Sequence, residues 1–166
     1  MMKSSEKKVV HPLEPIYDKN SKILLLGSLP SVKSREESFY YAHPQNRFWR
    51  VLSSVLNEKL PITNEEKQDM LLKNHIALWD VIHSCYIKGS SDASIKEVKA
   101  NDINSLLQKT SITTIFTTGK TAQKYYDKYC YPKTKIKAIC LPSTSPANAL
   151  KKESDLIEAY KIILDV

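Results

Sequence analysis

Residues 27–52 carry the densest group of side chains that could do chemistry. Three rings come first and an imidazole, a carboxamide and a guanidinium follow within a few residues, in the order Phe39, Tyr40, Tyr41, His43, Asn46 and Arg47. Ring faces stack on a flat base, and amides or backbone groups bind its polar edge. The segment therefore predicts a pocket for a flat ring with polar edges, such as a nucleobase.

Two of these residues have a structural alternative. Asn46 follows Pro44 at the start of a helical pattern, so it could cap that helix instead of taking part in chemistry. His43 could donate to a purine nitrogen or oxygen or to a phosphate, or it could fix its loop by bonding a backbone carbonyl. Of the three rings at 39–41, we expect at least one in the core and one stacked on the base.

The charge of the chain favours a polyanionic partner. The net charge is +7 and the isoelectric point is about 9.2, and lysine or arginine contacts to phosphates supply affinity that does not depend on sequence. Residues 120–137 hold six lysines against one acidic residue, Asp127. Such a cluster alone indicates a solvated helix face, but beside an aromatic pocket it favours nucleic acid.

The cysteines and the termini narrow the class of protein further. Cys85, Cys130 and Cys140 show no CxxC spacing and no nearby histidine pairing, so we expect no metal, no cofactor and free thiols in a reducing compartment. Residues 1–10 lack the apolar stretch of a signal peptide, and no apolar run is long enough to span a bilayer. We therefore expect a cytoplasmic protein without a membrane partner.

Strands and helices are expected to alternate along the chain. Apolar or β-branched runs predict strands over residues 22–27, 76–81, 112–118 and 136–141. Apolar spacing and capping residues predict helices from about 48, over 64–73, from 101 or 102 to 107, over 120–129 and over 151–164. This order favours a three-layer α/β/α sandwich with a mainly parallel four-stranded central sheet.

The remaining segments complete the predicted organisation. Residues 84–94 are polar and contain Gly89, which predicts a loop. Residues 1–21 predict an N-terminal arm that packs on the rest of the chain through His11, Leu13 and Ile16. Residues 22–166 are expected to form a single domain, because 166 residues suffice for one core and no linker divides them.

Two turns follow predicted strands and contain small residues. Residues 27–31 and 141–148 leave the first and last strands at the edge where parallel sheets bind ligands, so we expect them to lie together there. Their backbone amides could approach phosphate oxygens closely, and Ser143 and Thr144 could hold a phosphate, form a capping turn, or do both. Asp80, at the end of the second predicted strand, could line the same site.

These turns carry a family resemblance. Gly27-Ser28-Leu29-Pro30-Ser31 and Leu141-Pro142-Ser143-Thr144-Ser145-Pro146-Ala147-Asn148 resemble the two motifs of the uracil-DNA glycosylase superfamily, and Ala42-His43-Pro44-Gln45-Asn46-Arg47-Phe48-Trp49 is similar to a block in its mismatch-specific members. The set, which covers residues 22–164, is most similar to the hypoxanthine-DNA (deoxyinosine) glycosylases. The chain departs from many members at Leu29 and Leu141, where polar residues position water or donate to the base, and at Ser145, where some relatives carry an apolar wedge.

The resemblance implies a monofunctional glycosylase that removes a deaminated base, with hypoxanthine favoured, from double-stranded DNA. It implies that Asn46 matches an asparagine on which the hypoxanthine branch relies. We expect a monomer, and the predicted residues are Asn46 and His43 for catalysis, Ser28, Leu29, Phe39, Tyr40 and Tyr41 for the base, and Ser31, Ser143, Thr144, Ser145 and Asn148 for DNA. A uracil or mismatch glycosylase is one alternative. The other is a non-catalytic nucleic-acid-binding module, which Leu29 and Leu141 favour.

Overall fold

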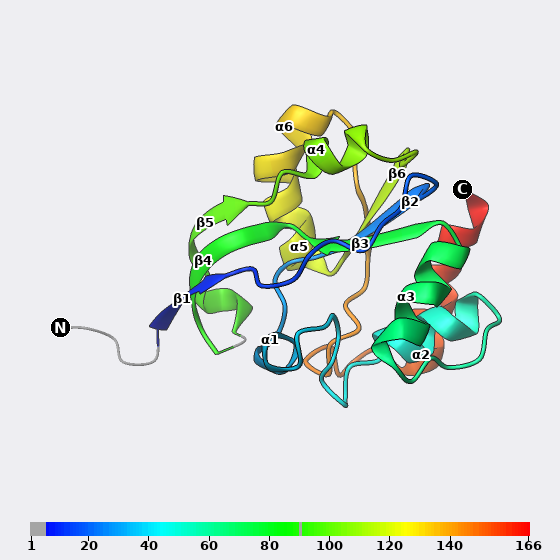
Figure 1. The fold of residues 1–166 in the computed structure, drawn as a ribbon. Coiled ribbons are helices and arrows are strands. Elements are labelled where there is room, and N and C mark those ends of the chain that lie inside the picture. The colour runs from blue at the N-terminus through cyan, green and yellow to red at the C-terminus, as the bar shows by residue number, and fades with distance from the viewer. Residues whose placement is uncertain (1–5, 90) are drawn as a thin grey trace.

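A four-stranded parallel sheet forms the centre of the protein in a computed structural model, which describes residues 6–89 and 91–166 (Figure 1). The strands are β2 (Ile23–Gly27), β3 (Ile76–Asp80), β6 (Thr114–Thr118) and β7 (Ile139–Leu141). Their spatial order is β3-β2-β6-β7 and each neighbouring pair is parallel, which confirms the predicted sheet. Residues 1–5 of the predicted arm and Ser90 of the predicted loop lie outside the described residues.

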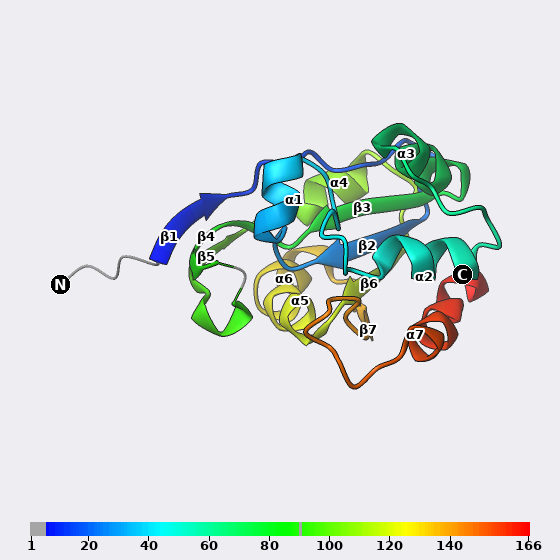
Figure 2. The same cartoon turned by 90° about the horizontal axis from the view of Figure 1, so that it is seen from below.

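Helices cover both faces of this sheet, as Figure 2 shows. One core packs β2 and β3 against α2 (Phe48–Val55), α3 (Asn64–Lys73) and α7 (Glu153–Tyr160). The other core packs the opposite face against α4 (Ile103–Gln108), α5 (Lys120–Tyr125) and α6 (Tyr131–Thr134). Strand β2 is buried throughout because Leu25 faces the first core while Leu24 and Leu26 face the second. The predicted three-layer sandwich is confirmed.

Element ends differ from the sequence prediction in several places. The third and fourth strands begin at Thr114 and Ile139, later than predicted. A π-helical turn at Tyr126–Cys130 continues α5, and a 3₁₀ turn at Lys161–Asp165 continues α7. No helix in residues 6–89 and 91–166 combines the length and the hydrophobicity needed to cross a bilayer.

A second sheet was not predicted. It is antiparallel and consists of β1 (Glu6–Val10), β4 (Ile82–Lys88) and β5 (Lys96–Ala100) in the order β1-β4-β5. The predicted loop over 84–94 is therefore wrong over 84–88, and its remaining described part includes a 3₁₀ turn at Asp92–Ser94. The pattern is misleading because polar residues in β4 are held by pairing with a segment more than 70 positions earlier in the chain.

The N-terminal segment lies along the main sheet after leaving β1. Leu13 and Ile16 are buried in the first core, and Ile16 forms an isolated antiparallel bridge with Leu78 of β3. His11 is also drawn into the protein, where its ring meets Asp80 at the end of β3. These contacts agree with an arm that packs on the domain, and the boundary at residue 21 stays a prediction.

Candidate functional site

A cavity of about 870 Å³ opens at the carboxyl ends of the parallel strands. Its walls come from the segments that follow β2, β6 and β7 and from Asp80 at the end of β3. Such crevices are the usual ligand sites of open parallel sheets, and this volume is ordinary for a small-molecule site. Ser31 and Ser143 both line it, which confirms that the two predicted turns lie at one edge of the sheet.

Most of the predicted site residues line this cavity. Ten of the twelve do so: Ser28, Leu29, Ser31, Tyr40, Tyr41, Asn46, Ser143, Thr144, Ser145 and Asn148. The two that do not are Phe39 and His43. The roles assigned to all twelve stay predictions, because the fold establishes where these side chains lie and not what they contact in DNA.

Gly27 allows three elements to meet at the base of the cavity. It ends β2 opposite Asp80 of β3. A Cβ atom on Gly27 would clash with Oδ1 of Asp80 and would lie 3.0 Å from the hydroxyl of Tyr41. The absence of a side chain here therefore lets a carboxylate and a phenol approach the end of the strand.

A short helix positions the cluster of rings near the end of β2. Ser31 caps α1 (Val32–Glu37), where its Oγ accepts from the N–H of Ser34 at 3.2 Å. The hydroxyl of Ser34, which is buried, accepts from the N–H of Ala42 at 3.0 Å. Ser38 and Tyr41 adopt positive φ angles of 55° and 52°. These local bonds and left-handed turns fold the chain back so that Tyr41 faces the cavity.

The three rings have different surroundings. Phe39 stacks on Trp49 with a centroid distance of 6.1 Å and lies off the cavity. Tyr40 is buried and donates to the carbonyl of Glu14 at 2.7 Å, while part of it borders the cavity. Tyr41 stacks on Phe48 at 3.9 Å, so one of its ring faces is already covered.

The phenol of Tyr41 is held in its neutral form. Its hydroxyl lies 2.9 Å from Oγ1 of Thr118 at the end of β6. Burial raises the pKa of Tyr41 well above its ordinary value, and the neighbouring Asp80 carboxylate raises it further. Tyr41 therefore presents a protonated hydroxyl at the cavity wall at neutral pH.

The oxygen of the Asn46 carboxamide is hydrogen-bonded, whereas its nitrogen is free. Its Oδ1 accepts from the N–H of Phe48 at 2.9 Å and from the hydroxyl of Thr144 at 2.8 Å. A backbone N–H can only donate, which fixes the oxygen toward Phe48 and the amide nitrogen on the other side. Within the described residues, Nδ2 makes no hydrogen bond. The N-cap of α2 is Arg47, so the capping alternative is wrong for Asn46, which bonds the first helical N–H from one residue before the cap. Its amide group is left as a donor beside the cavity.

His43 lies away from the cavity wall. Its Nδ1 accepts from the N–H of Gln45 at 3.1 Å. This contact matches the loop-fixing alternative, with a backbone N–H in place of the expected carbonyl. A catalytic role for His43 stays a prediction.

Arg47 fixes the second turn, a function that the sequence did not reveal. Its backbone N–H and Nε bond the carbonyl of Thr144 at 3.1 and 3.4 Å. The guanidinium also donates to the carbonyls of Ser145 at 3.0 Å, Asn148 at 3.1 Å and Lys151 at 2.5 Å. The planar fork of arginine suits this multiple contact. The only sequence signal was the position of Arg47 beside Asn46 in the same block.

Polar side chains of the second turn, residues 141–148, stabilise it through hydrogen bonds within the turn. Ser143 Oγ accepts from the N–H of Ser145 at 3.1 Å, and Ser145 Oγ accepts from the N–H of Ala147 at 3.1 Å. The amide of Asn148 donates to the carbonyl of Ser143 at 3.0 Å. These are the expected turn contacts, and a serine hydroxyl that accepts one bond can still donate to a phosphate.

Other cavity residues complete the wall. Asp80 lines it, as the sequence suggested, and Leu29 and Leu141 add hydrocarbon. Thr118, Lys120 and Lys151 also line it but were not predicted, although Thr118 and Lys120 lie at the end of a predicted strand and just after it. In residues 6–89 and 91–166, no group of three or more His, Cys, Asp or Glu side chains is placed to hold a metal ion.

Comparison with known proteins identifies the family. The sequence profile of the uracil DNA glycosylase superfamily matches residues 14–164. A relative from Methanosarcina barkeri named hypoxanthine DNA glycosylase is 32% identical over 150 residues, covering 89% of this chain and 95% of the relative. A second protein of that name, from Methanosarcina acetivorans, is 35% identical over 137 residues, or 80% and 84% of the two chains.

A solved structure shares the fold. The solution NMR structure of a Methanosarcina acetivorans protein, which its description relates to the uracil DNA glycosylases, superposes with a TM-score of 0.77 at 31% identity. The superposition covers 91% of this chain and 96% of the other. The profile match spans both turns and the block between them, and the fold agrees over nearly the whole length. This chain therefore belongs to the uracil DNA glycosylase superfamily, as its motifs predicted.

Proposed function

We propose that this protein is a DNA glycosylase that hydrolyses the bond between a deaminated base, hypoxanthine in particular, and deoxyribose. Family membership and the names of the two curated relatives support this activity. The single structural observation that carries it is Asn46, whose amide nitrogen is left free beside the cavity while its oxygen is held by Phe48 and Thr144.

The proposed reaction requires stabilisation of charge more than a strong base. The N-glycosidic bond breaks with its electron pair going to the base, the oxygen of one water bonds to C1′ of the sugar, and a proton from that water ends on the base. Nδ2 of Asn46 donates a hydrogen bond to the departing base and stabilises its negative charge. Leu29 and Leu141 exclude water from the wall around it.

The partner is double-stranded DNA with a damaged base. A base must leave the stack to enter such a cavity. Lys120 and Lys151 line the cavity, where ammonium groups suit the phosphates on either side of an extruded nucleotide. We propose that the protein acts as a cytoplasmic monomer, without a cofactor, and that no lysine forms a covalent intermediate.

A non-catalytic binding module is the second candidate, because Leu29 and Leu141 occupy wall positions where many relatives carry polar groups. A glycosylase that prefers uracil or a mismatch is the third.

One experiment separates these functions. Duplexes that contain hypoxanthine, uracil, xanthine or a thymine mismatch are incubated with excess protein, and abasic sites are then cleaved with alkali. The expected result is excision of hypoxanthine at the highest single-turnover rate, with strand breaks only after alkali. Breaks without alkali would contradict a monofunctional enzyme. Binding to damaged DNA without excision of any base would favour the non-catalytic module.

A further inference from the structure

The antiparallel sheet of β1, β4 and β5 is not used by the proposed hydrolysis, and its two faces differ. One face packs against the core that α4, α5 and α6 cover, through Val9, Cys85 and Ile87. Side chains alternate along a strand and cross-strand partners share a face, so the residues between these point away from that core. The outward face consists of Glu6, Lys8 and Val10 of β1, Ser84, Tyr86 and Lys88 of β4, and Lys96 and Lys99 of β5.

The outward face is basic. Its four lysines against one glutamate leave a net charge of +3. Glu6 pairs with Lys96 at 3.3 Å, whereas the other three lysines make no ion pair within residues 6–89 and 91–166. Two of these three, Lys8 and Lys99, are exposed. Glu97 lies in the irregular part of β5 between the paired positions, and counting it still leaves an excess of two positive charges.

A tyrosine lies among these lysines. Tyr86 stands opposite Lys8 of β1 on one side and opposite Lys96 of β5 on the other. It is half-buried, and its hydroxyl makes no hydrogen bond in the part of the chain that the structure describes. Ammonium and phenol groups both bind phosphate oxygens in protein–DNA complexes. Clustered on one face, they form the kind of surface that binds a nucleic-acid backbone.

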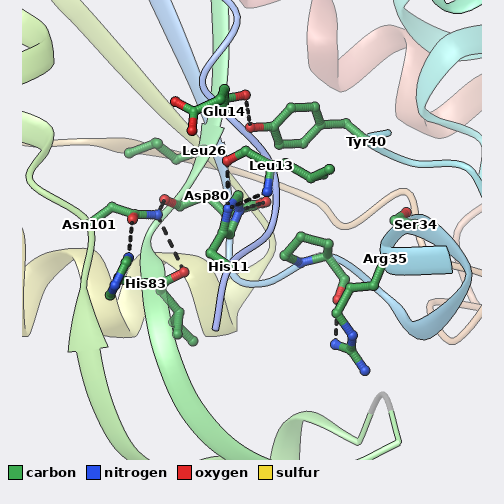
Figure 3. A network of polar contacts seen from close by, with 12 residues as sticks. His11, Leu13, Glu14, Leu26, Ser34, Arg35, Tyr40, Asp80, His83 and Asn101 are labelled. Atoms are coloured by element: carbon green, nitrogen blue, oxygen red, sulfur yellow. Dashed lines mark hydrogen bonds and ion pairs between the residues drawn. The ribbon is translucent and has the colours of Figure 1, made fainter. Parts of the chain in front are cut away.

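Hydrogen bonds fix the second sheet to the end of β3. Strand β1 leads into His11, whose Nε2 lies 2.8 Å from Oδ2 of Asp80. Strand β5 leads into Asn101, whose amide donates to the carbonyl of Asp80 at 2.8 Å. Figure 3 shows both contacts meeting at Asp80, which lines the cavity. The outward face therefore has a fixed position relative to the cavity.

Strand β4 and the segment after it also form part of the cavity wall. Ile87 and Asp92 line the cavity. Arg35 of α1 donates to the carbonyls of Pro30 at 2.8 Å and Gly89 at 3.3 Å, which joins the end of β4 to the turn after β2. A duplex whose extruded base occupies the cavity therefore passes close to this sheet on one side of the extruded nucleotide.

We propose that the outward face of the second sheet is an additional DNA contact, which binds the phosphate backbone of the duplex on one side of the extruded nucleotide. This inference rests on the proposed glycosylase function and assigns a part of the DNA partner that the cavity does not touch. The unpaired lysines displace counterions from the backbone, and Tyr86 donates to a phosphate oxygen.

Removing charge at the two exposed, unpaired lysines tests the proposal. In the double variant Lys8→Gln with Lys99→Gln, the slope of log affinity against log salt should fall by about 2. Lys8→Arg with Lys99→Arg keeps both charges and should keep the slope. The matched control is Lys109→Gln with Lys133→Gln, two exposed positions at the end of α4 and on α6 that do not line the cavity. It should leave the slope unchanged.

Trimmed duplexes locate the contact. A long duplex is compared with two that end close to the hypoxanthine, one trimmed on the 5′ side and the other on the 3′ side. The glutamine variant of Lys8 and Lys99 should lower the slope on the long duplex and on only one trimmed duplex. Lys120→Gln should lower it on all three, because Lys120 lines the cavity. The slope is also measured on undamaged DNA, which has the same phosphates.

Three results would overturn the proposal. They are an unchanged slope in the glutamine variant of Lys8 and Lys99, an equal fall in the control, and an equal fall on all three duplexes. Loss of binding to vesicles of anionic phospholipid, with an unchanged DNA slope, would assign the face to a membrane instead. Failure of the proposed function looks different: the unaltered protein would excise none of the bases, while the change in slope on undamaged DNA would remain.

Discussion

Asn46 combines a structural and a chemical function in one side chain, and the two belong to different atoms. The oxygen bonds Phe48 and Thr144, while the nitrogen is free beside the cavity. We expect Asn46→Asp to keep both bonds to the oxygen and to lose the donor. Excision in single turnover should fall by about 10²–10³-fold, as for other lost donors to a developing anion, while the melting temperature stays near that of the unaltered protein.

Asn46→Ala provides the comparison. It removes the bonds of Oδ1 as well as the donor, so excision should fall equally and the free energy of unfolding should fall by about 1 kcal/mol. Calorimetry and single-turnover excision on both variants separate the two functions. Normal excision by Asn46→Asp would show that the side chain only holds the start of α2 and the second turn, and would leave His43 as the next candidate.

Among the secondary-structure elements, the end of β2 determines how closely the walls of the cavity approach. Gly27→Ala would place a Cβ against Asp80 and Tyr41, and a misplacement of roughly 1 Å can cost about 10² in rate. We expect a loss of that order in single-turnover excision. Gly89→Ala is the control, since its Cβ would meet nothing within 4 Å, although its φ of +58° adds strain of about 1–2 kcal/mol. Equal excision by both variants would contradict this explanation.

The turn after β7 depends on a contact from a different element. Arg47, at the start of α2, bonds four carbonyls between Thr144 and Lys151. Arg47→Lys should loosen residues 143–152, because an ammonium group cannot reproduce the planar fork. Hydrogen exchange in this turn should accelerate, and the free energy of unfolding should fall by about 1.5–3 kcal/mol.

Arg50→Lys is the matched control for the loss of the Arg47 contacts. Arg50 pairs with Glu153 at 2.7 Å, and both side chains are substantially exposed. Such pairs contribute only about 0–1 kcal/mol. If the amide hydrogens of residues 143–152 exchanged at the same rate in the Arg47→Lys and Arg50→Lys variants, Arg47 would not be the residue that holds this turn.

For the molecule as a whole, the net charge of +7 should make DNA binding depend steeply on salt. The lysines of residues 120–137 are not equivalent in this respect. Lys120 lines the cavity, whereas Lys133 lies on α6 and does not. Lys120→Gln should reduce the slope of log affinity against log salt by about 1, while Lys133→Gln leaves it unchanged. Affinity that does not change with salt would exclude a site that follows the phosphates.

Local sequence patterns were sufficient to predict the central sheet, its helical layers and most of the cavity wall. Continuous apolar runs such as residues 23–26 specify strands buried on both faces, and strands alternating with helices leave few topologies other than a parallel sandwich. Once that sheet is parallel, its carboxyl ends lie together, so the turns at 27–31 and 141–148 had to meet. The family followed from the same turns and the block at 42–49.

Packing between distant segments established which atoms of those residues are available. Three contacts join segments far apart in the chain: the pairing of strands in the second sheet, the bonds from Arg47 to the turn after β7, and the contact of His11 with Asp80. No local pattern records such contacts, because they depend on where distant elements pack. The direction of the Asn46 amide is likewise set by Phe48 and Thr144 together. Residue types could therefore be interpreted from the sequence, while the free donor on Asn46 and the pairing of Asp80 with His11 could not.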